Sequence, residues 1–157
     1  MRITLFGALT WAVTAASAAA QDTVNIIVPS AVSFPVTDVT QSTSGGPSPA
    51  TLSFSNANLR PGRALRVSVQ ADGGAFTPPS GSSIPTSKVS WTTVGASGGT
   101  GLNGTLSSSS YALVFQSDPA RTSGHIDLAW TLAAPGSGIR AGSHQLTIRW
   151  KLESITP

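Results

Sequence analysis

Apolar and polar residues alternate along most of the chain with a period of two residues. In the segments 125–133 (HIDLAWTLA) and 144–154 (HQLTIRWKLES), every second residue is a large apolar one. This period puts alternate side chains on opposite faces of an extended backbone, so each segment predicts a half-buried strand with one wet face. No window shows a sustained helical period, and the chain is therefore expected to be built from strands.

Six further short segments have strand character, and residues that favour turns separate them. They are 23–28, 31–36, 51–55, 64–71, 88–94 and 111–115. The connecting sequences GGPSP, TPPSGSS and APGSG are rich in Gly, Pro and Ser, which favour turns for separate conformational reasons. About eight short strands predict an all-β fold, an antiparallel β-sandwich of the immunoglobulin-like type.

The first twenty residues have the pattern of a secretory signal peptide. Arg2 precedes an apolar stretch at 3–16, and three alanines at 18–20 form a small-residue cleavage site. The apolar stretch is too short for a membrane span, so no transmembrane segment is expected. We expect residues 1–20 to be removed and residues 21–157 to be exported as a single domain to the cell surface, the periplasm or the medium.

Composition excludes several classes of partner and cofactor. The chain has no cysteine, which excludes disulfides and thiolate metal sites. Charged residues make up 10% of the chain and the formal net charge is +3, with the basic residues scattered along the sequence. Nucleic-acid binding requires a clustered basic face, so no nucleic-acid partner is expected.

The stretch GASGGTGLNG at 95–104 matches two catalytic signatures, the nucleophile elbow G-x-S-x-G around Ser97 and the dinucleotide pattern G-x-G-x-x-G. Both signatures act only when a helix follows, whereas the sequence here continues as a Ser-rich run and an alternating strand. We therefore expect 97–101 to be a flexible connection and Asn103-Gly104 to form a type I′ hairpin turn. Asn103 also begins an N-glycosylation sequon, which matters only in an organism that modifies such sites.

Metal-binding and catalytic residues are sparse. The chain has two histidines, and only His125 has an acid nearby on the same strand face, Asp127. Two ligands are fewer than the three or four that zinc sites use. The six acids are spread over separate loops and strands. We therefore expect no metal, no cofactor and no enzymatic activity.

The pattern Trp-x-Leu occurs twice, at Trp130 and Leu132 and again at Trp150 and Leu152. Large aromatic residues in an all-β domain commonly fill the core, so core packing is one interpretation of both pairs. The other interpretation is that the two pairs form a binding motif.

The C-terminal sequence LTIRWKLESITP, which ends at Pro157, resembles the closing motif of WxL-domain proteins, a family of secreted β-rich modules. The sequence IIVPSAVSFPV near position 30 is similar to the opening strand of that family. The chain departs from the family pattern where His144 takes the place of a Tyr, and its other Trp-x-Leu lies later than the region of RVSVQADGG. The resemblance implies non-covalent attachment to a cell-wall polymer, peptidoglycan.

The signal peptide, the β-rich segment that follows it and the final alternating strand also resemble secreted fibre and pilin-type subunits. In such subunits a strand of one protomer completes the sheet of the next, by addition to an open edge. The resemblance implies a donor strand at 22–28, with Val24, Ile26 and Val28 as its alternating apolar residues. The same segment is equally suited to be the first strand of its own sandwich.

A soluble carbohydrate-binding module is the third hypothesis, with Trp91 and Tyr111 as the expected exposed aromatic residues. The sequence thus predicts a secreted, non-enzymatic surface or extracellular structural protein. Association with a cell-wall polymer is the leading mechanism, and self-assembly into a fimbria-like fibre is the alternative.

Overall fold

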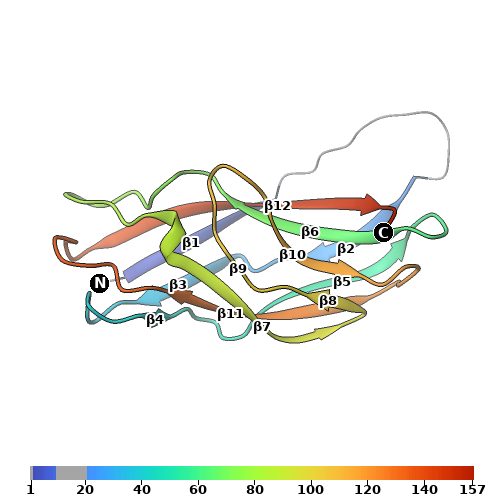
Figure 1. Ribbon diagram of the computed structural model, residues 1–157, viewed down its shortest axis with the longest axis horizontal. Coiled ribbons are helices and arrows are strands. Elements are labelled where there is room, and N and C mark those ends of the chain that lie inside the picture. The colour runs from blue at the N-terminus through green and yellow to red at the C-terminus, as the bar shows by residue number, and fades with distance from the viewer. Residues whose placement is uncertain (1, 10–20) are drawn as a thin grey trace.

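The computed structural model describes residues 2–9 and 21–157 as two β-sheets that pack face to face, with a single turn of 3-10 helix at Thr86–Lys88 (Figure 1). The predicted all-β sandwich is confirmed. Among these residues, none lies in a helix with the length and apolarity that a membrane crossing requires.

The strand order defines the two sheets. The first sheet runs β3 (Ala31–Pro35), β1 (Arg2–Leu9), β12 (Ser143–Ile155), β6 (Ala64–Ala71), β10 (Ala112–Ser117) and β8 (Gly99–Gly101). The second runs β2 (Thr23–Ile27), β5 (Ala50–Asn58), β11 (Gly124–Leu132), β7 (Val89–Ser97) and β9 (Gly104–Thr105), with β4 (Thr43–Ser44) beside β11. All eight segments predicted as strands are strands, and β1, β4, β8 and β9 are additional to them.

The core between the sheets is filled by the apolar residues of the alternating pattern. Trp91, Trp130 and Trp150 are its largest side chains, and each is at most 1% exposed. Trp91 pairs with Trp130 across β7 and β11, and their ring centroids lie 5.3 Å apart at an interplanar angle of 49°. Leu132 is buried and Leu152 is partly buried against the same core. Both Trp-x-Leu pairs are therefore part of the core.

The expectation that Trp91 is exposed is wrong. Its side chain lies on the core side of β7, and its indole Nε1 donates a hydrogen bond to the Leu102 carbonyl oxygen at 2.8 Å. The polar neighbours Ser90 and Thr92 belong to the opposite face, as alternation along a strand requires.

The glycine-rich stretch is also more ordered than expected. Instead of a flexible connection, Gly99–Gly101 forms β8 and pairs with β10. Asn103 is outside the left-handed region, which excludes a type I′ turn, and its Oδ1 accepts a hydrogen bond from the Thr93 N–H at 2.7 Å. Glycine is required at Gly101 because a Cβ there would come within 2.6 Å of the Thr93 methyl carbon. The glycines permit close packing between strands.

Trp130→Ala is expected to lower the free energy of unfolding by about 3–5 kcal/mol, because it removes a buried ring and leaves a cavity. Urea unfolding followed by circular dichroism measures this loss. The control is Thr92→Ala, at an exposed position of the neighbouring strand, which should change stability by less than about 0.5 kcal/mol. Equal effects of the two substitutions would contradict the core assignment.

Candidate functional site

The strand β1 occupies a position between β3 and β12 in the first sheet (Figure 1). It pairs with β12 in parallel over eight residues, from Arg2 beside Ser143 to Leu9 beside Trp150. It pairs with β3 in the antiparallel direction over five residues, Arg2 to Phe6. In the part of the chain that the structure describes, β3 and β12 do not pair with each other. We call the strand position between them the acceptor slot.

The two strands that border the acceptor slot depend on its occupant for their hydrogen bonds. β6 pairs with β12 only from Ile148 onward, so residues 143–147 of β12 bond to β1 on one side and to residues 72–77 on the other. β3 makes one further bridge, between Ser33 and Gly46, with both N–H···O distances at 2.8 Å. Without an occupant, one edge of each strand would present unpaired backbone groups.

Buried, mostly apolar residues border the acceptor slot at every second register position. They are at most 4% exposed, and they are Val32 and Phe34 of β3 and His144, Leu146, Ile148 and Trp150 of β12, of which only His144 is polar. The register pairs these positions with Ile3, Leu5, Gly7 and Leu9 of β1. The slot therefore suits an extended segment with uncharged, mostly aliphatic residues at alternate positions.

The expected donor segment at 22–28 lies in the protein's own second sheet. Its residues 23–27 form β2, an edge strand that pairs with β5 alone, with an irregularity in the register between Thr23 and Asn25. Val24, Ile26 and Val28 are partly buried against the core, whereas Ile27 is 70% exposed. The segment thus occupies the first-strand position that the sequence offered as the other interpretation.

Asp22 anchors the beginning of β2. Its Oδ1 accepts a hydrogen bond from the Arg60 N–H at 2.8 Å, and its carboxylate lies 3.4 Å from Nε of both Arg60 and Arg63. Partial burial acts to raise the pKa of Asp22, but hydrogen bonds from Ser154 and Arg60 and the charge of Arg60 together hold it below its ordinary value. The ionised carboxylate therefore stabilises β2 in its place.

A second polar cluster joins β5, β7 and β11. The sequence placed His125 and Asp127 on one strand face, but it did not predict their contacts with Ser97 and Thr51. Ser97 Oγ lies 2.7 Å from His125 Nδ1, and His125 Nε2 lies 3.9 Å from Asp127 Oδ2. Thr51 Oγ1 donates a hydrogen bond to Asp127 Oδ1 at 2.6 Å. Only the β7–β11 register, which pairs His125 with Ser97, could have revealed this cluster. Ser97 is exposed at the end of β7 and no helix follows it, so the geometry of a nucleophile elbow is absent there.

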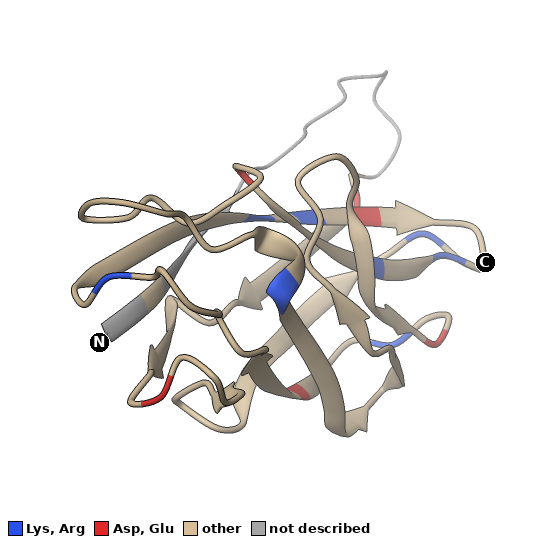
Figure 2. Ribbon diagram, turned by 60° about the vertical axis from the view of Figure 1, so that its left-hand side comes forward, with Lys and Arg blue, Asp and Glu red and all other residues tan. Residues whose placement is uncertain are grey.

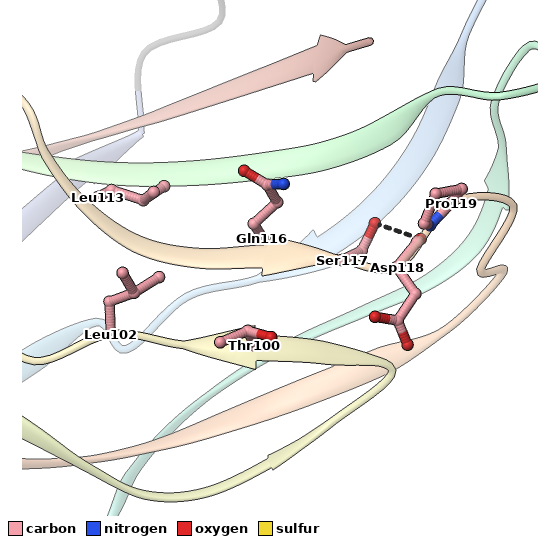
Figure 3. A pocket seen from close by; sticks show the side chains of 7 residues that line it. All are labelled: Thr100, Leu102, Leu113, Gln116, Ser117, Asp118 and Pro119. Atoms are coloured by element: carbon pink, nitrogen blue, oxygen red, sulfur yellow. Dashed lines mark hydrogen bonds between the residues drawn. The ribbon is translucent and has the colours of Figure 1, made fainter. Parts of the chain in front are cut away.

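A hollow of about 310 Å³ opens between β8 and β10 at the edge of the first sheet (Figure 3). Tyr111, at 38% exposure, lies outside it, with Lys151 Nζ 5.6 Å from the ring centroid. The lining has no aromatic ring on which a sugar could stack. It consists of Thr100, Leu102, Leu113, Gln116, Ser117, Asp118 and Pro119.

Charged side chains are dispersed over the molecule (Figure 2). The acids pair with bases or hydroxyl groups: Asp72 with Arg149, Asp118 with Arg121 at 3.4 Å, Glu153 with Lys151 at 2.7 Å, and Asp38 with Thr40. Within residues 2–9 and 21–157, no three His, Asp or Glu side chains gather closely enough to hold a metal ion. The charges thus serve local contacts between neighbouring segments.

Comparison of the chain with models of known protein families finds no match, and comparison with curated proteins finds none either. The acceptor slot is therefore interpreted from its own geometry.

Asp22→Asn is expected to speed amide hydrogen exchange in β2 by about fivefold at pH 7, because the anchoring charge is lost. A carboxylate with a lowered folded-state pKa contributes stability above its unfolded-state pKa, and this contribution disappears as pH falls through the folded-state value. The difference between variant and parent should therefore vanish in acid. Exchange measured by mass spectrometry at several pH values tests this. Asp38→Asn, which alters an exposed turn, is the control and should leave β2 unchanged.

Proposed function

We propose that this protein is an exported, non-enzymatic structural subunit that joins further copies of itself into fibres by strand addition. The observation that carries the proposal is the position of β1 between β3 and β12. In this proposal residues 1–20 are the secretory signal and leave on export. The mature first sheet then has a vacant strand position.

A vacancy at this position is unfavourable for an isolated subunit. It leaves backbone groups of β3 and β12 without partners and opens the apolar positions of the acceptor slot to water. A strand from another chain supplies both kinds of contact, since its main chain pairs with the edges and its alternate side chains fill the apolar positions. Strand addition is therefore the reaction that this vacancy favours.

The donor that we propose is the segment 22–28 of a second copy. Val24, Ile26 and Val28 have the two-residue spacing that the acceptor slot requires. In its own sheet β2 pairs on one side only, with β5, whereas a strand in the slot pairs on two sides, with β3 and β12. When the donor moves from its own sheet to the slot of a second copy, it loses the ladder with β5 and gains ladders with β3 and β12.

The alternative hypotheses have less support. The rings of Trp130 and Trp150 are buried in the core, which disfavours direct contact of either ring with a cell-wall polymer in the folded domain. Wall attachment would need another surface. Of the two aromatic residues expected to bind carbohydrate, only Tyr111 is exposed.

Protein that begins at Gln21 is expected to form a discrete ladder of multimers in size-exclusion chromatography with light scattering. Ile26→Asp should reduce the multimer fraction by about tenfold or more, because it places a charge at an apolar position of the donor. The matched control is Ile27→Asp, one residue along and on the exposed face of β2, which should assemble normally. Circular dichroism of each variant verifies that the domain is folded.

A folded monomer at every concentration would contradict the proposed assembly. If this monomer sedimented with insoluble cell-wall polymer, wall attachment would replace assembly as the function. An amorphous aggregate that Ile26→Asp does not affect would also count against strand addition.

A further inference from the structure

We infer that the acceptor slot is a peptide-binding site that the precursor closes with its own residues Arg2–Leu9, so that assembly is blocked until this segment is released. The blocking role rests on the proposed function, whereas the docking of the segment in the slot does not depend on that function.

The ladders define how this segment binds. All eight residues of β1 pair with β12, and the first five also pair with β3. The segment thus satisfies both open edges over residues 2–6 and continues along β12 alone over residues 7–9. Because the main chain of the segment pairs with two strand edges, the slot accepts an extended peptide.

The sequence of the segment matches the slot position by position. Ile3 and Leu5 stand in register with buried residues of both bordering strands, and Leu9 stands beside buried Trp150. Thr4 instead pairs with exposed Gln145 and partly buried Ser33. The segment has no charged residue after Arg2, which matters because an unpaired charge at an apolar position costs several kcal/mol.

The covalent tether explains how this occupant excludes a second copy. A covalently tethered segment that can reach its site has an effective concentration on the order of millimolar. A competing strand from another protomer at micromolar concentration is then disfavoured by about a thousandfold. Cleavage after residue 20 removes this advantage and leaves the segment free to dissociate. Signal removal therefore acts as the switch that opens the slot.

The direction of β1 also permits its replacement. β1 is parallel to β12, which provides the longer ladder, and parallel pairing is slightly less stable per residue than antiparallel pairing. A strand that enters in the reverse direction would be antiparallel to β12 over the longer ladder and parallel to β3 over the shorter one. The longer ladder therefore favours exchange of the leader segment for a reversed strand.

The test uses the full chain from Met1, with a protease recognition sequence inserted between Ala20 and Gln21 so that the folded protein can be cut. Docking is read from amide hydrogen exchange at residues 143–147, independently of assembly. Leu5→Asp should speed this exchange by about tenfold or more. Thr4→Asp adds the same charge one residue earlier, at a polar register position, and should change exchange by less than about threefold.

Assembly is then followed by light scattering before and after the cut. The uncut chain should be monomeric, and the Leu5→Asp chain should form multimers without being cut. The cut chain should form multimers once the released segment is removed by dialysis, and an excess of synthetic peptide 2–9 should prevent this.

The possible results separate the two proposals. Residues 143–147 that exchange equally fast with and without Leu5→Asp would overturn docking, whatever the assembly state. Multimers of the uncut, unsubstituted chain would overturn the blocking role and leave the proposed function standing. A cut chain that releases its segment and stays monomeric would overturn the proposed function, and the blocking role with it.

Discussion

Backbone hydrogen bonding along the outer edge of β12 is the constraint on which the first sheet depends. The first half of this strand lies beyond the reach of β6 and needs a partner on its other side, and β3 needs the same partner. A strand between them joins both to the sheet and covers the apolar positions at Leu146, Ile148 and Trp150. Whichever segment fills this position therefore controls whether the sandwich is closed.

In the second sheet, by contrast, all strand pairing is between segments that follow residue 20. Trp91 and Trp130 pack together across β7 and β11. Ser97 hydrogen-bonds to His125, and Asp127 lies beside His125 and accepts a hydrogen bond from Thr51. β2 lies at one edge of this sheet, held by its ladder with β5 and by the charge contacts of Asp22. An edge strand of one sheet is thus the proposed donor for the vacancy in the other.

Sequence reasoning was accurate where a segment's own pattern decides its structure. Alternation predicted eight strands, and core packing, one of the two interpretations of Trp130 and Trp150, is the one that the structure has. It failed at Trp91 because the polar neighbours of that residue lie on the opposite face of a half-buried strand. They therefore do not indicate whether the Trp91 side chain is exposed. It failed at 97–105, because glycines that allow close packing look the same in sequence as glycines that allow flexibility. The strand at Arg2–Leu9 was missed because its composition predicts a signal peptide.

The sequence by itself determined that this protein is all-β and which faces of β11 and β12 are buried, since both depend on a local period of two residues. Only the tertiary structure decided which strands are neighbours. It brought Arg2–Leu9 beside a strand about 140 residues away in the chain, and Ser97 beside His125. A strand's alternation specifies its faces, whereas its edges carry the same N–H and C=O groups in every sequence. For that reason the acceptor slot, which is made of edges, became visible only in the folded protein.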